Sequence, residues 1–124
     1  MSGKILLFGF DSLLHVLALE KAVEPFGVEL IPVAKTDYHK SLAALVGLDT
    51  APGTAHPGAA VPLGGRMLVL CGLEKELDTL LPVLRQAGAG PDCLKAVLTQ
   101  ENRGWNAATL YGELLREHTK LERK

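Results

Sequence analysis

The stretch ILLFGFD, residues 5–11, decides the fold of this 124-residue chain. An apolar run that does not alternate is typical of a strand covered on both faces, so residues 5–10 predict a buried parallel strand. Asp11 is a good N-cap, and residues 13–26 then place apolar side chains at helical spacing. The chain therefore opens with a strand and a helix, whose expected buried face carries Leu14, Leu17, Ala18, Ala22 and Val23.

A second stretch of the same kind, LVLCGL at residues 68–73, lies 63 positions after ILLFGF. Both strands end in Gly followed by a large apolar residue, and a helix is expected after the second one at 74–87. Pro82 inside that helix predicts a kink or a late helix start, because proline has no N–H to donate. Two further strands are expected at 28–34 and 93–99. Pro32 marks the first of them as an edge strand or a bulge.

Helices at 37–48 and 106–121 complete the order βαβα, linker, βαβα. This order predicts the α/β class, with a four-stranded, mainly parallel sheet and helices on both faces in three layers. The sequence does not determine the strand order, for which 2-1-3-4 is a guess. The halves 1–48 and 66–124 are similar, and common ancestry and shared physical constraint both explain the similarity. Each half is too small to be stable alone, so we expect one domain over residues 1–124.

Residues 49–65 contain three prolines and four glycines and predict a linker. Its 17 residues exceed the usual length of a structureless connection in a compact domain. The sequence leaves open whether it is a lid over a site or a tether.

Composition excludes several partners. A formal charge of −1 gives no field that attracts nucleic acid or an anionic membrane, and 5% aromatic residues give no base-stacking surface. The apolar runs are far shorter than the roughly 20 residues that cross a bilayer. Two cysteines without paired spacing, and no secretory signal, predict a cytoplasmic, reduced protein.

Ligands of open α/β sheets bind beyond the carboxyl ends of the strands. The richest such end is TQENRGW, residues 99–105, just before a helix N-terminus that is able to receive an anion. The predicted ligand-binding residues are Thr99, Asn102, Arg103 and Trp105, together with Asp11 after the first strand.

A structural interpretation of the same turn stays open. Asn102 and Asn106 then make turn and cap hydrogen bonds, Trp105 packs on the sheet edge, and Arg103 is solvated.

Cys71 is a weak catalytic candidate, at a strand end where a helix N-terminus stabilises a thiolate. No histidine is close in sequence, and a small buried hydrophobe is the better interpretation, as it is for Cys93. The histidines show neither His-x3-His spacing nor a Cys-x2-Cys partner, so no metal is expected. No GxGxxG or Walker A motif is present, so no cofactor is expected.

The C-terminal half, from Met67 to about His118, resembles a small bacterial family classed as a domain of unknown function. The similarity is carried by LVLCGL at 68–73, KAVLT at 95–99, Asn102, Trp105 and a Leu-rich last helix. Asn106 stands where the family pattern has Thr, and both residues cap helices. The resemblance covers about half of the chain, implies no activity, and favours the turn 99–105 as the site.

Three functions remain in competition. The first is a non-catalytic module that binds a small molecule or a partner protein. The second is an enzyme with thiol-dependent chemistry at Cys71, and the third is a purely structural homodimer formed through the last helix or the edge of the second strand. Missing acid/base pairs and missing metal spacing favour the first and third.

Overall fold

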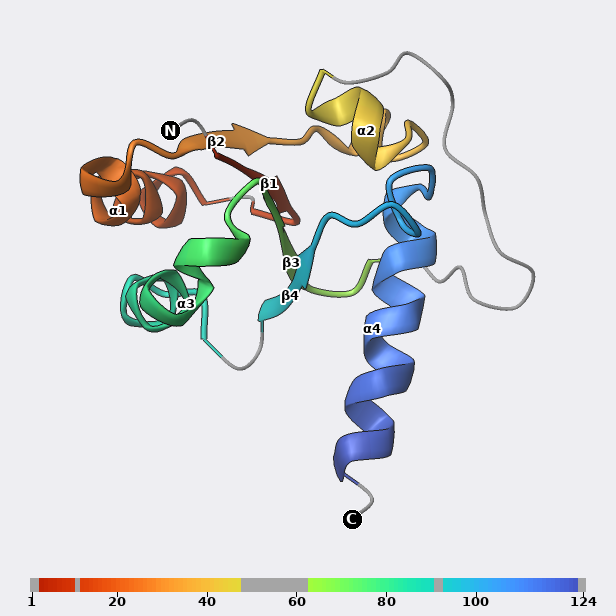
Figure 1. Cartoon of the computed structure of the whole chain (residues 1–124). Coiled ribbons are helices and arrows are strands. Elements are labelled where there is room, and N and C mark those ends of the chain that lie inside the picture. The colour runs from red at the N-terminus through yellow and green to blue at the C-terminus, as the bar shows by residue number, and fades with distance from the viewer. Residues whose placement is uncertain (1–2, 11, 48–62, 91–92, 123–124) are drawn as a thin grey trace.

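The apolar runs of the sequence become the strands of one sheet, with helices packed on its two faces. A computed structural model describes residues 3–10, 12–47, 63–90 and 93–122, with side chains up to residue 116. The elements follow in the order β1 (Lys4–Phe8), α1 (Leu13–Val23), β2 (Glu29–Pro32), α2 (Leu42–Leu45), β3 (Arg66–Cys71), α3 (Leu77–Gln86), β4 (Cys93–Val97) and α4 (Ala107–Glu122) (Figure 1). Asp11 and most of the predicted linker 49–65 lie outside the described residues.

The sheet has the strand order β2-β1-β3-β4. The guessed order 2-1-3-4 agrees with it, and Pro32 lies in an edge strand as expected. β1 pairs with β2, and β3 with β4, in parallel, whereas the central pair β1 and β3 is antiparallel. The mainly parallel sheet is therefore confirmed with one exception at its centre. The exception matters for function, because the carboxyl ends of β1 and β2 lie at the opposite end of the sheet from those of β3 and β4.

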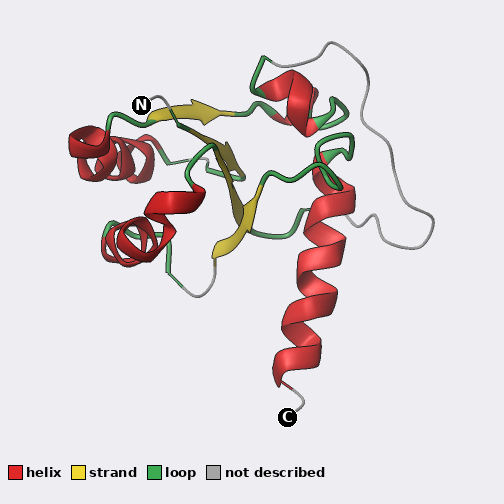
Figure 2. Ribbon diagram, viewed as in Figure 1, coloured by secondary structure: helices red, strands yellow, loops and turns green. Residues whose placement is uncertain are grey.

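Helices cover both faces, as expected (Figure 2). One core lies between the sheet and helices α1 and α3, and includes Ile5 and Leu7 of β1. The other lies under α2 and α4, and includes Leu6 and Phe8. Successive strand residues point to opposite faces, so the unbroken apolar run supplies both cores at once. None of the helices in the described ranges is long and apolar enough to cross a membrane.

The face that α1 buries differs from the prediction. Leu19 and Val23 are buried, whereas Leu14 is 77% exposed, Leu17 is 48% exposed and Ala18 is also exposed. The helix LLHVLALEKAV is apolar nearly all round, so the spacing of its leucines does not identify the inward face.

The predicted helix 37–48 is mostly turn, because α2 spans only Leu42–Leu45. Ser41 caps it by accepting a hydrogen bond from Ala44 N–H at 3.0 Å. Gly47, with φ +86°, follows its end. The third helix begins late, at Leu77 after a 3-10 turn, and Pro82 lies inside it.

The two halves of the sheet are joined in the same way. Val33 N–H donates to Leu7 O and Leu98 N–H donates to Leu70 O, each at 2.9 Å. The central register pairs Leu6 with Val69, which lies 63 positions later, the spacing that relates the two apolar stretches in the sequence. Position 97 in β4 thereby takes the place that Pro32 has in β2, since each immediately precedes the residue that closes the ladder.

Candidate functional site

The turn after β4 is held by the side chain of Asn102, which is 7% exposed. Its Oδ1 accepts a hydrogen bond from Thr99 N–H at 2.8 Å, and its Nδ2 donates to Val97 O at 3.0 Å. Thr99 Oγ1 in return accepts from Asn102 N–H at 3.2 Å. The amide of Asn102 thus bonds the edge of β4 as a neighbouring strand would, and ends the strand at Val97, two residues before the predicted end. The structural interpretation of Asn102 is confirmed, and so is the helix cap at Asn106, whose Oδ1 accepts from Thr109 N–H at 2.9 Å.

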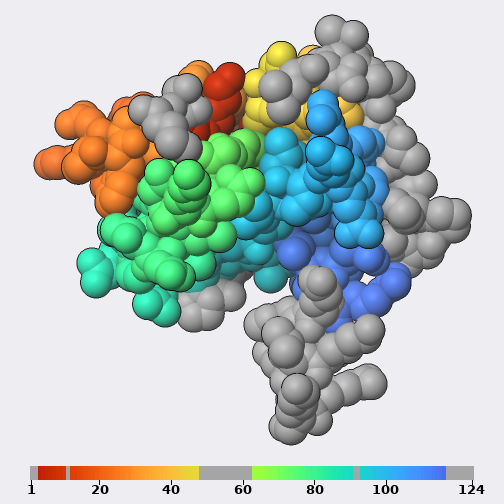
Figure 3. Space-filling view, in the orientation of Figure 1, coloured from red at the N-terminus to blue at the C-terminus, as the bar shows by residue number. Residues whose placement is uncertain are grey.

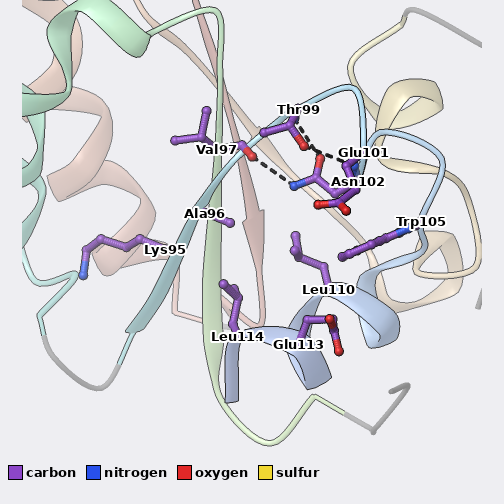
Figure 4. A pocket seen from close by; sticks show the side chains of 10 residues that line it. All are labelled: Lys95, Ala96, Val97, Thr99, Glu101, Asn102, Trp105, Leu110, Glu113 and Leu114. Atoms are coloured by element: carbon purple, nitrogen blue, oxygen red, sulfur yellow. Dashed lines mark hydrogen bonds between the residues drawn. The ribbon is translucent and has the colours of Figure 1, made fainter. Parts of the chain in front are cut away.

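A cavity of about 370 Å³ opens between β4, this turn and α4, and we name it the α4-side pocket. Apolar groups of Trp105, Leu110 and Leu114 line it together with two carboxylates, those of Glu101 and Glu113. In Figure 4 the ring of Trp105 lies between the Glu101 and Glu113 side chains. The complete lining is Lys95, Ala96, Val97, Thr99, Glu101, Asn102, Trp105, Leu110, Glu113 and Leu114.

The two carboxylates differ in their surroundings. Glu113 is half-buried and pairs with Arg116 one turn along α4 at 3.4 Å. Glu101 is exposed and makes no hydrogen bond or ion pair with the described residues. Lys95 also lines the pocket, but its ammonium bonds to Cys93 O and Gly90 O, so Glu101 is the charged side chain of the lining without a partner among the described residues. A carboxylate at this place does not suit the anion-binding turn that the sequence suggested.

The predicted site residues do not converge on one place. Thr99, Asn102 and Trp105 line the α4-side pocket. Arg103 lines another hollow of about 290 Å³, with Gly72 and Glu74, beyond the carboxyl ends of β3 and β4, and Thr99 lines this hollow as well. Asp11 cannot be placed, because it lies outside the described residues.

The outer edge of β4 carries backbone groups that have no hydrogen-bond partner among the described residues. Leu98 N–H donates to Leu70 O of β3, and backbone groups alternate along a strand, so those of Lys95 and Val97 face away from the sheet. Asn102 takes Val97 O, and the ammonium of Lys95 folds back to donate to Cys93 O and Gly90 O, each at 3.0 Å. Three backbone groups have no hydrogen-bond partner among the described residues: Lys95 N–H, Lys95 O and Val97 N–H.

A second hollow flanks this edge on the other face of the sheet. It has a volume of about 400 Å³, and we name it the α3-side pocket. Its lining consists of Asp78, Leu81, Pro82 and Arg85 of α3 together with Lys95. In Figure 3 the cyan atoms of β4 reach the surface between the green atoms of α3 and the blue atoms of α4. The open edge is thus bordered by one cavity above the sheet and one below it.

The opposite edge of the sheet, formed by β2, lacks a backbone hydrogen-bond donor that β4 has. Val33 faces β1, so Pro32 of β2 faces outward, where it has no N–H to offer. Proline at such a position is a common protection against unwanted strand pairing. Val97 takes the corresponding place in β4 and keeps its N–H.

Cys71 is buried in the core under α2 and α4, with 8% of its surface exposed. Burial, and secondarily the negative charge of Glu74, raises the pKa of its thiol to about 11. A thiol with such a pKa is a poor nucleophile near neutral pH, which argues against thiol chemistry at this position. Cys93 is also buried, and neither cysteine forms a disulfide bond within the described residues. No three His, Cys, Asp or Glu side chains among the described residues lie together as a metal site.

The residues that line the α4-side pocket belong to one continuous part of the chain, from Lys95 in β4 to Leu114 in α4. Residues 66–121 match DUF3783, a domain of unknown function. The domain-of-unknown-function resemblance of the C-terminal half is thereby confirmed at that level. The DUF3783 match includes β4, the Asn102 turn and both carboxylates of the α4-side pocket, and excludes β1 and β2. No curated protein and no solved structure matches the chain.

The sequence did not single out Glu101, Glu113 or Ala96 as site residues. Glu113 lies in the helix predicted at 106–121, and Ala96 lies in the strand predicted at 93–99. A partial signal was present, because Glu101 lies inside the polar turn and Glu113 lies one helical turn before Arg116.

Proposed function

We propose that this chain is a non-catalytic interaction module that accepts an extended segment of a partner protein along the outer edge of β4. The observation that carries the proposal is the open edge itself, since Lys95 N–H, Lys95 O and Val97 N–H face outward between two cavities. A segment that adds as a fifth strand satisfies these groups and sends alternate side chains into the α3-side and α4-side pockets. Backbone pairing supplies affinity in this mode of recognition, and the pockets supply specificity.

An edge strand that avoids partners is usually blocked by proline, a bulge or an outward charge. β2 has Pro32 at the relevant position, but β4 has none of these features. Its one lysine, Lys95, is half-buried and bonds backward to its own chain rather than standing over the edge. The difference between the two edges supports a function for β4 that β2 does not share.

Two parts of the proposal concern the whole chain. We propose that residues 1–48 and 66–124 are two diverged copies of one βαβα unit, which the matching ladders and the 63-residue spacing support. The two buried cysteines, which form no disulfide bond within the described residues, fit a reducing compartment, and we propose the cytoplasm as the location.

The test is a selection of random 12-residue peptides, displayed on phage, on the immobilised full chain. Selected peptides are then synthesised and titrated against the protein in solution. Trp105 is the single tryptophan of the chain, so its fluorescence reports events at the α4-side pocket directly.

The decisive variant is Val97→Pro, which removes the outward N–H and copies the residue found in β2. It leaves the ladder to β3 intact, because position 97 does not donate to that ladder. We expect peptide affinity to fall about tenfold or more, from the lost hydrogen bond and the bulk of the ring. The matched control, Pro32→Val, restores an N–H to the β2 edge and should leave peptide affinity unchanged.

Peptides that bind Val97→Pro as tightly as the natural chain overturn the proposal, as does a selection that enriches no peptide. Light scattering addresses the homodimer. A dimer that Val97→Pro converts to a monomer makes a second copy of this chain the occupant of the edge and overturns the partner-protein proposal.

A further inference from the structure

The side chains that border the β4 edge indicate which residue the bound segment carries. We infer that the segment places a lysine or arginine opposite Ala96, in the α4-side pocket between Glu101, Trp105 and Glu113. This inference rests on the proposed function and adds the chemistry of the ligand.

Geometry selects the position. Side chains directly opposite each other on neighbouring strands project from the same face of a sheet. Ala96 packs on the α4 side, together with Leu94 and Leu98. The residue of an added strand that faces Ala96 therefore points toward the α4-side pocket, and its two neighbours point toward α3. Because Ala96 is small, the space beside it is left to the incoming side chain.

The lining selects the type of side chain. Leu110, Leu114 and the Trp105 ring offer an apolar wall, and the carboxylates of Glu101 and Glu113 stand at this wall (Figure 4). A long basic side chain matches both parts, because its methylene groups pack on apolar surface while its charged end reaches polar groups. A cation is also attracted to the face of an aromatic ring, most strongly to that of tryptophan. The pocket volume of about 370 Å³ accommodates either basic side chain.

The opposite half of the molecule shows that the fold does not require these residues. The turn after β2 is built without a tryptophan, and an ion pair between Asp37 and Lys40, at 3.2 Å, lies within it. The turn after β4 instead carries Glu101 without a partner among the described residues and Trp105 at the cavity wall. Glu101 and Trp105 are thus features of the turn after β4 that the turn after β2 does not share.

The experiment uses the tightest peptide from the phage selection. Each position of the peptide is replaced in turn by norleucine, which has an aliphatic chain of similar length without charge, and the dissociation constant is measured by Trp105 fluorescence. We expect one basic position at which norleucine weakens binding about tenfold. In the double variant Glu101→Gln, Glu113→Gln that preference should shrink to about twofold. Glu20→Gln, an exposed carboxylate on α1, is the matched control and should preserve the full preference.

A further variant, Ala96→Leu, fills the space opposite the incoming residue and should weaken the basic peptide and its norleucine form alike. Peptides that contain no position sensitive to charge, but still lose affinity in Val97→Pro, overturn this inference and leave the proposed function standing. A charge preference that survives both glutamine substitutions also overturns it. Peptides that are indifferent to Val97→Pro overturn the inference and the proposed function together.

Discussion

Replacing Asn102 by alanine removes the clamp that shapes the end of β4. The change deletes the hydrogen bonds from Thr99 N–H at 2.8 Å and to Val97 O at 3.0 Å, and leaves both backbone groups without their side-chain partner. A net contribution of about 1 kcal/mol for each bond, together with partial desolvation of the groups left behind, gives a loss of about 2–3 kcal/mol.

This loss is measurable by thermal unfolding. An unfolding entropy of about 2.1 cal/mol/K per residue amounts, over 124 residues, to about 0.26 kcal/mol/K, so Asn102→Ala should lower Tm by about 8–12 °C. The assay is calorimetry or circular dichroism on the full chain. Gln100→Ala, an exposed residue in the same turn, is the control and should change Tm by no more than about 2 °C. An Asn102→Ala variant that melts within 2 °C of the natural chain refutes the role of the amide as a clamp.

Three further predictions use the same methods. Asn106→Ala loses a single helix cap and should lower the free energy of unfolding by about 1 kcal/mol, or Tm by about 4 °C. An unchanged Tm would show that the Asn106 cap does not stabilise the fold. Because the pKa of Cys71 is raised in the folded chain to about 11 from an ordinary 9.0, the stability that this thiol contributes is complete below pH 9 and is lost as pH rises toward 11. Urea unfolding between these pH values should show a fall in the free energy of unfolding that Cys71→Ala abolishes. A fall of equal size in Cys71→Ala would assign the pH dependence to other groups. Leu19→Ala should cost about 2–5 kcal/mol, whereas Leu14→Lys should stay within about 0.5 kcal/mol, and the reverse order would restore the helix face predicted from the sequence.

The strands were predictable because burial on both faces leaves a direct trace in the sequence. The apolar runs at 5–10 and 68–73 locate β1 and β3 to within two residues, and Pro32 correctly marks an edge. Strand direction was not predictable, because an apolar run reads the same whether its neighbour is parallel or antiparallel. The antiparallel central pair therefore separates strand ends that the sequence had grouped at one rim.

Helix faces and helix lengths failed for two different reasons. α1 has apolar residues on every side, so no periodicity could select Leu19 over Leu14. The segment 37–48 has helical spacing, but Leu42 N–H donates to Trp105 O and Ala43 N–H donates to Arg103 O, which ties the helix start to the other half of the chain. Tertiary bonds of this kind leave no local signal.

The candidate site was half predictable. The turn from Thr99 to Trp105 stood out by composition, and it does line the α4-side pocket. The rest of the site depends on the strand order, which leaves β4 at the edge, and on α4 folding back to bring Glu113 beside Trp105. Ala96 can be recognised as a site residue only when the edge of β4 beside it is known to be open.

Amide hydrogen exchange along β4, followed residue by residue by NMR, tests the open edge most directly. In the free chain, the N–H groups of Ala96 and Leu98 should exchange slowly because they bond to β3, whereas those of Lys95 and Val97 should exchange fast. Addition of a selected peptide should slow Lys95 and Val97 while Ala96 and Leu98 change little. Fast exchange that persists at Val97 in the saturated complex would contradict strand addition at this edge.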